Sequence, residues 1–182
     1  MSDAFWLFVV IFLIIGVGSA AWAGVRAAPW LPTRRDDIRR LFDLAELKPG
    51  ETVYDLGCGD GRVLLVAAEE YGARAVGFEI SIVPYLAALV RRAMNPFRKN
   101  ITVRFEDFYR TSLKEADLVY CFLTPSAMQR LKTKFVRELR PGARVVSYTF
   151  SLGDLPGVIR DKPTPKLPTA YLFRTDHPPI SR

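Results

Sequence analysis

The chain has 182 residues, of which 49% are apolar and 25% charged, so an intrinsically disordered protein is excluded and one globular domain with a small addition is expected. Its formal net charge of +7 favours anionic partners such as phospholipid headgroups. Two cysteines, Cys58 and Cys121, and one histidine, His177, are too few for the usual zinc sites, so no metal is predicted.

Residues 1–27 are predicted to form a transmembrane anchor. Residues 5–25 carry no charge, and a helix of that length can cross the roughly 30 Å apolar core of a bilayer. Trp6 and Trp22 lie near its two ends, where indole rings favour the membrane interface. Only Asp3 precedes this stretch, whereas a cluster of arginines follows it. The positive-inside rule therefore predicts a single span with the rest of the chain in the cytosol.

A cleaved signal peptide is the alternative, because Ala21-Trp22-Ala23 resembles a cleavage site. No basic segment precedes the apolar stretch, and the arginines after it oppose translocation, so the anchor is favoured. We expect the anchor to act by tethering alone, so that removing it leaves cofactor binding intact.

Residues 28–182 are predicted to form one domain. Its first helix is expected to begin after Thr33, an N-cap residue with Asp36 three positions later, and to end before Pro49-Gly50. Strands are expected at 52–56, 74–79, 101–106, 117–123, 143–150, 158–161 and 169–175. Further helices are expected at 62–71, 82–94 and 126–139. This alternation is typical of a doubly wound, mostly parallel α/β sheet with helices on both faces.

A glycine-rich turn, Asp55-Leu56-Gly57-Cys58-Gly59-Asp60-Gly61-Arg62, follows the first predicted strand. Its glycines let the backbone turn tightly and approach a ligand. Glu79 ends the second strand, where a carboxylate can accept hydrogen bonds from ribose hydroxyls. Arg62 stands where the third glycine of a dinucleotide motif would be, and Asp55 and Asp60 would repel a pyrophosphate. The charges suit a ligand with an ammonium and a sulfonium instead.

This motif set resembles the class I methyltransferases, which use S-adenosyl-L-methionine and have a seven-stranded, Rossmann-like sheet. The resemblance rests on the turn, on Glu79 and on Glu106-Asp107 after the third strand, and it spans about residues 29–175. It implies that Asp55, Gly57, Gly59 and Gly61 of the turn shape the pocket for the methionine part of the cofactor, with Cys58 and Asp60 also among the cofactor-binding residues.

The same resemblance implies that Glu79 holds the ribose, and that Asp107 and Phe108 hold the adenine. Changing Glu79 to Ala would then weaken cofactor binding and leave the stability of the cofactor-free protein almost unchanged. Phe122 is expected beside the cofactor, because it ends a strand where such sheets bind ligands. Tyr120 and Tyr148 are expected in the core rather than in a substrate cage.

More narrowly, the chain is similar to the small membrane-anchored lysine methyltransferases that modify the c subunit of ATP synthase. The shared features are the apolar N-terminus, Pro29–Thr33, the turn and Gly77-Phe78-Glu79. The likeness implies lysine methylation of a membrane-protein substrate. The sequence Phe122-Leu123-Thr124-Pro125 differs from the Asn-Pro-Pro-Tyr of enzymes that methylate adenine or amide nitrogens, so no nucleic-acid partner is expected.

Two short segments, Pro32-Thr33 and Thr124-Pro125, are candidates for loops beside the substrate or cofactor. Two other functions stay open: methylation of a lipid or lipophilic small molecule, and cofactor binding without catalysis. The sequence identifies no general base and no oligomeric state.

Overall fold

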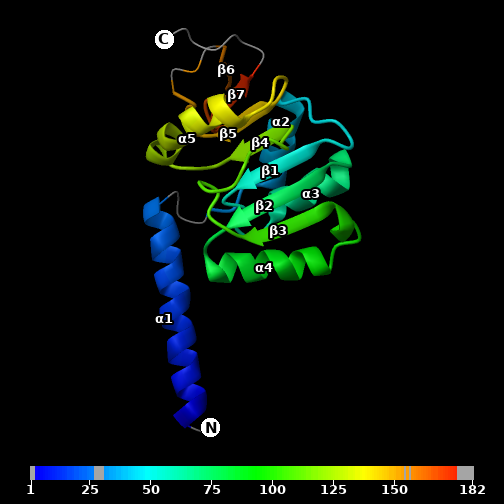
Figure 1. The fold of residues 1–182 in the computed structure, drawn as a ribbon. Coiled ribbons are helices and arrows are strands. Elements are labelled where there is room, and N and C mark those ends of the chain that lie inside the picture. The colour runs from blue at the N-terminus through cyan, green and yellow to red at the C-terminus, as the bar shows by residue number, and fades with distance from the viewer. Residues whose placement is uncertain (1–2, 27–30, 154, 156, 176–182) are drawn as a thin grey trace.

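The computed structural model describes residues 3–26, 31–153, 155 and 157–175. His177 and part of the Pro29–Thr33 stretch lie outside these ranges. The described residues form a long N-terminal helix, α1 (Asp3–Arg26), and an α/β domain in which helices pack against a central sheet (Figure 1).

The sheet has seven strands in the order β3-β2-β1-β4-β5-β7-β6. The strands are β1 (Thr52–Leu56), β2 (Arg74–Glu79), β3 (Ile101–Phe105), β4 (Leu118–Cys121), β5 (Arg144–Tyr148), β6 (Ile159–Asp161) and β7 (Ala170–Arg174). Strands β1 to β5 pair in parallel, and β7 runs antiparallel to both of its neighbours. Every residue of β4 and β5 is buried, as expected for central strands that are covered on both faces. The predicted mostly parallel α/β sheet is thus confirmed.

The helices of the domain cover both faces of the sheet. They are α2 (Arg35–Leu44), α3 (Arg62–Tyr71), α4 (Ile82–Ala93) and α5 (Pro125–Glu138), with a short 3-10 helix, η1 (Arg98–Asn100). Side chains of α2 and α3, such as Phe42 and Leu64, belong to one core cluster, whereas Leu131 and Phe135 of α5 belong to the other. The sheet therefore separates two hydrophobic cores.

Several predicted element boundaries are confirmed to the residue, including those of β1, α3 and β2. The start of the first helix of the domain was predicted wrongly. Arg34, not Thr33, is the N-cap of α2, and no side chain caps that helix. The reason is that the Thr33 hydroxyl lies 2.9 Å from the Tyr120 hydroxyl and is engaged there. Likewise β4 ends at Cys121, so Phe122 lies just beyond the strand rather than in it.

Helix α1 passes the carboxyl edge of the sheet beside the start of α4, and its N-terminal part extends away from the domain (Figure 1). This part exposes large apolar side chains, including Phe8 and Ile14. No helix, taken over the residues that are described, is both long and apolar enough to cross a membrane. The N-terminal helix is therefore confirmed as a helix, whereas the predicted transmembrane span is not confirmed.

Candidate functional site

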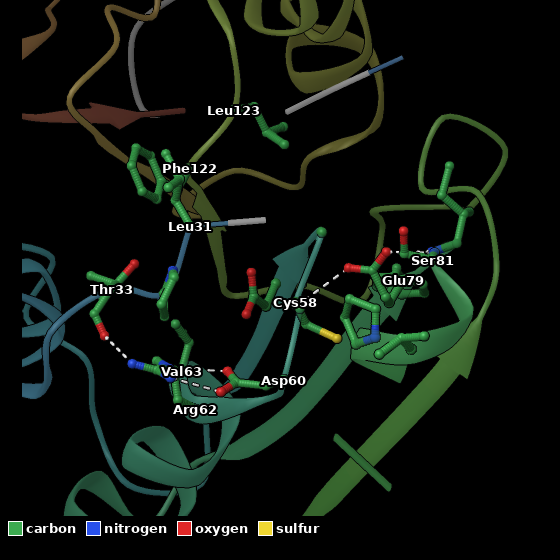
Figure 2. A pocket seen from close by; sticks show the side chains of 18 of the residues that line it. Leu31, Thr33, Cys58, Asp60, Arg62, Val63, Glu79, Ser81, Phe122 and Leu123 are labelled. Atoms are coloured by element: carbon green, nitrogen blue, oxygen red, sulfur yellow. Dashed lines mark hydrogen bonds and ion pairs between the residues drawn. The ribbon is translucent and has the colours of Figure 1, made fainter. Parts of the chain in front are cut away.

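A cavity of about 340 Å³ opens at the carboxyl ends of the central strands. Residues at and just after the carboxyl ends of β1, β2 and β4 line it, together with the segment before α2 (Figure 2). Part of α1 lines the cavity as well. The strand order reverses between β1 and β4, and ligands of open α/β sheets bind at such a reversal. Both the size and the place of the cavity suit a small organic cofactor.

The glycine turn forms the floor of this cavity. Gly57 and Gly59 have φ values of 88° and 54°, a left-handed conformation that suits glycine. The amides of Gly57 and Cys58 donate to the carbonyl of Phe78 at 2.9 and 3.0 Å, which ties the turn to the end of β2. Gly61 does not line the cavity; it is the N-cap of α3, again with a left-handed backbone.

Gly77, in β2, allows the turn to pack this closely. A Cβ atom at position 77 would lie 2.6 Å from the Cys58 sulfur and 2.6 Å from Leu64 Cδ1, distances that real Cβ atoms do not show. Cys58 is buried against this glycine, and burial raises the pKa of its thiol well above the ordinary value, helped by the charges of Asp55 and Glu79. Cys58 is therefore a small, protonated residue of the cavity wall.

Glu79 connects the turn to the start of α4. Its Oε2 accepts a hydrogen bond from the Gly59 amide at 2.9 Å, and its Oε1 accepts from the amides of Ile80 and Ser81 at 2.9 and 2.7 Å. Burial raises the pKa of Glu79, although these three bonds act in the opposite direction. A carboxylate can accept about four hydrogen bonds, so Glu79 keeps acceptor capacity toward the cavity that it lines.

Asp55, at the end of β1, is buried and faces the cavity. Its Oδ2 atom has no hydrogen-bond partner in the described structure. Burial raises the pKa of Asp55 well above its ordinary value, and the nearby charges of Glu79 and Asp60 raise it further. Buried acceptors of this kind normally have a donor, so the unpaired oxygen fits a ligand that brings a positive charge or a donor.

Asp60 behaves differently from Asp55, which the sequence did not distinguish. Its carboxylate lies 2.7 Å from Arg62 and 3.1 Å from Arg91 of α4. Burial alone would raise the pKa of Asp60, but the hydrogen bonds from Arg62 and the charges of both arginines lower it. The charge of Asp60 is therefore already compensated. Of the two aspartates, Asp60 is the one paired with arginines in the described structure, and Asp55 is the one with an oxygen open to a cationic ligand.

Arg62 occupies the position of the third glycine of a dinucleotide motif. Besides its ion pair with Asp60, it donates a hydrogen bond to the backbone carbonyl of Thr33 at 3.3 Å, and so joins the turn to the segment before α2 (Figure 2). Arg62 lines the cavity, although the sequence singled it out only as a mismatch to a dinucleotide motif.

The wall opposite the turn is largely apolar and aromatic. Leu31, Pro32 and Thr33 contribute from the segment before α2, whereas Phe122 and Leu123 contribute from the end of β4. The Phe122 ring packs edge-on against Tyr148, with 5.0 Å between centroids. Tyr120 is buried as expected for a core residue, yet it also lines the cavity.

Three further predicted residues lie outside the cavity lining: Asp107, Thr124 and Pro125. The Asp107 carboxylate accepts from the Tyr109 amide at 3.0 Å and closes a turn. Thr124 caps α5 by accepting from the Ala127 amide, and Pro125 begins that helix. Each segment still places a neighbour in the wall, since Phe108 follows Asp107 and Leu123 precedes Thr124.

The cavity also includes residues that sequence reasoning missed. Leu13, Gly16 and Val17 of α1 line it, together with Val83 and Pro84 of α4. No sequence signal marked this contact, because the apolar pattern of α1 is equally compatible with an isolated helix. The contact between α1 and α4 is thus a part of the site that two segments distant in the sequence build together.

Comparison with known proteins agrees with this geometry. Residues 55–158 match the family model described as the ANTKMT methyltransferase domain. A protein-lysine N-methyltransferase of Saccharolobus islandicus is 35% identical over 68% of this chain and 78% of its own length. The adenine nucleotide translocase lysine N-methyltransferase of Mus musculus is 36% identical over 68% of this chain and 54% of its own length. A lysine N-methyltransferase of Xenopus laevis, named for the c subunit of ATP synthase, is 30% identical over 67% of this chain and 53% of its own length.

The chain therefore spans about half the length of the two vertebrate relatives. Among solved structures, an RNA methyltransferase from Salinibacter ruber in complex with S-adenosyl-L-homocysteine superposes with a TM-score of 0.77 and is 29% identical. The match covers 83% of this chain and 98% of that one. The chain belongs to the ANTKMT methyltransferase domain family and is a class I methyltransferase that uses S-adenosyl-L-methionine.

Proposed function

We propose that this protein methylates the ε-amino group of a lysine on a membrane-associated protein. The observation that carries the proposal is the apolar rim of the cavity, which includes Leu13 and Val17 of α1 beside Leu31. All three side chains are largely exposed, and the rim continues into the exposed apolar surface of α1. An acceptor held at such a surface would reach the cavity without a separate substrate domain.

The names of the relatives support the choice of lysine and of a membrane protein. Three of them are named as lysine methyltransferases, and two of those names specify the adenine nucleotide translocase and the c subunit of ATP synthase. The proposal extends this type of target to the present chain.

S-adenosyl-L-methionine, when bound, would supply a methyl group on a sulfonium, from which a neutral thioether leaves readily as the methyl is transferred. The protein must hold the donor, align the acceptor and exclude water. The unpaired Oδ2 of Asp55 is suited to the ammonium of the methionine part, and Glu79 to the ribose hydroxyls. Phe108 lines the cavity and would offer an apolar surface to the adenine.

A lysine acceptor must lose a proton before it attacks, because its ordinary pKa is about 10.4. Leu31, Phe122 and Leu123 would surround the lysine with apolar surface, and loss of hydration lowers the pKa of an ammonium. Tyr120 does not serve as the base: burial raises the pKa of its hydroxyl well above the ordinary value, so it stays protonated at neutral pH. Its hydroxyl instead pairs with Thr33 and fixes the segment that carries Leu31.

The acceptor class is tested by incubating membranes from cells that lack this protein with the purified full-length chain and radiolabelled S-adenosyl-L-methionine. We expect the label in the protein fraction and, after acid hydrolysis, in methylated lysine. Label in the lipid extract would replace lysine by a lipid or lipophilic small molecule, and label in RNA would replace it by a nucleic acid. Cofactor binding without transfer to any fraction would indicate a non-catalytic scaffold.

We also propose that α1 holds the domain at the membrane, with the domain on the cytosolic side. The exposed apolar side chains of α1 and the arginines that follow it support this arrangement. A reporter fused after Arg182 should then be active only if it is one that works in the cytosol. Export of that reporter, or a mature chain that begins near Gly24, would contradict the proposal.

A further inference from the structure

Helix α1 contributes to the cofactor cavity as well as presenting apolar surface. Leu13, Gly16 and Val17 line the cavity together with Val83 and Pro84 from the first turn of α4. We propose that docking of α1 on α4 completes the cofactor site, with Gly16 as the point of close approach. This inference rests on the cofactor assignment and not on the identity of the methyl acceptor.

The contact between the two helices is polar as well as apolar. The Ser81 hydroxyl donates to the Ser19 carbonyl at 3.2 Å, and the Ile82 amide donates to the Ser19 hydroxyl at 3.3 Å. Ser81 is the N-cap of α4 but forms no capping bond with its own side chain. Since the first amides of a helix have no partner within it, Ser19 of α1 supplies an acceptor that α4 lacks. The start of α4 is thus capped by a residue of α1.

Gly16 sets how closely the helices approach. A Cβ atom at position 16 would lie 3.3 Å from Val83 Cγ2, which is tighter than most real contacts. Gly18, two residues further along the same helix, has nothing within 4 Å of its Cβ position. A large side chain at 16 would therefore force the helices apart, whereas the same side chain at 18 would meet open space.

Displacement of α1 would affect the cofactor site through Ser81, which contacts both α1 and Glu79. Ser81, which bonds to Ser19, also donates its amide to Oε1 of Glu79, the carboxylate assigned to the ribose. Moving α1 would leave Ser81 without its bond to Ser19 and would open the cavity between Gly16 and Val83 to water. On this proposal, removal of α1 would weaken cofactor binding, whereas the sequence predicted that α1 acts by tethering alone and that its removal leaves binding intact.

The experiment compares Gly16→Leu with Gly18→Leu in the full chain, purified in the same detergent. Both changes put leucine into the same helix, so their effects on helix propensity and detergent binding are matched. Calorimetric titration with S-adenosyl-L-homocysteine should show affinity about tenfold weaker for Gly16→Leu, and affinity within about twofold of the wild type for Gly18→Leu. Adding Val83→Ala to Gly16→Leu should restore part of the affinity, because it removes the side chain that the new leucine meets.

Thermal unfolding of the cofactor-free variants separates this effect from loss of the fold. Rescue by Val83→Ala at a melting temperature close to that of the wild type supports the proposal. Equal affinity in the two glycine variants would overturn it. So would weakened affinity in Gly16→Leu that Val83→Ala does not improve. If the affinities change as expected but no lysine is methylated, the proposed acceptor is wrong and this inference still holds.

Discussion

Replacing Asp55 by Asn is expected to stabilise the cofactor-free protein and to weaken cofactor binding at the same time. The Asp55 carboxylate is buried, and one of its oxygens has no partner among the residues that the structure describes. Burial raises its pKa, and the charges of Glu79 and Asp60 raise it further. Asparagine has nearly the same shape and no charge. The amide still leaves a buried polar atom unpaired, but it removes the buried negative charge and its repulsion by Glu79 and Asp60. This gain is worth about 1–3 kcal/mol, and each kcal/mol raises the melting temperature of a chain this long by about 2–4 °C.

The loss of affinity has the same origin as the gain in stability. The unpaired oxygen of Asp55 is suited to the ammonium of the cofactor, and a charge-assisted hydrogen bond contributes about 1.5–3 kcal/mol. The dissociation constant for S-adenosyl-L-homocysteine should therefore rise by about ten- to a hundredfold. A lower melting temperature for Asp55→Asn would mean that the carboxylate is stabilised in the folded state, contrary to this account.

The pH dependence of stability provides a second measurement. The pKa of Asp55 is raised in the folded protein. At a pH between the ordinary carboxyl pKa and this raised pKa, the folded state therefore holds a proton that the unfolded state has lost. The associated stability is fully present below the ordinary carboxyl pKa and is lost as the pH rises through the folded pKa. Between these two pKa values, the melting temperature of the wild type should therefore decrease more steeply with pH than that of Asp55→Asn.

Local patterns in the sequence predicted the fold and the floor of the site well. The turn after β1 and the strand that ends at Glu79 lie within about 25 residues of each other, and their apolar patterns and glycines are strong local signals. A parallel sheet then forces the ends of β1, β2 and β4 to one edge. For this reason ten of the fourteen residues proposed from sequence line the cavity in the structure.

The remaining features depend on contacts between distant segments. Thr33 has the sequence context of an N-cap, but a buried tyrosine 87 positions later engages its hydroxyl instead. Asp60 looks equivalent to Asp55 in the motif, yet Arg91 of α4 reaches one and not the other. The contact of Gly16 with Val83 leaves no local pattern at all. Contacts of this kind depend on tertiary packing, and no periodic pattern or motif in the sequence predicts them.

Replacing Glu79 by Ala is expected to impair both stability and binding, which reverses part of the sequence-based expectation. From the motif alone, Glu79 should matter only to the ribose. In the structure its carboxylate accepts hydrogen bonds from the amides of Gly59, Ile80 and Ser81. Alanine would leave these three donors without their acceptor in a buried region. Each unsatisfied group costs about 1–3 kcal/mol, although water entering the vacated space would offset part of that.

We therefore expect a decrease of about 2–4 kcal/mol in the free energy of unfolding of the cofactor-free protein, measured by urea titration. The affinity for S-adenosyl-L-homocysteine should fall by at least tenfold, because the ribose contact and the position of the turn are lost together. Glu46→Ala is the matched control, since Glu46 is an exposed glutamate whose ion pair with Arg174 contributes little.

Comparison with Glu79→Gln separates the two roles of the carboxylate. Glutamine keeps one oxygen that can accept from the amides of Ile80 and Ser81, but its NH₂ group cannot accept from Gly59. Stability should therefore be partly recovered relative to alanine, while the turn at Gly59 remains unsupported and binding remains weak. If Glu79→Ala lowers affinity without changing the unfolding curve, the three amides find other partners and Glu79 acts on the ribose alone.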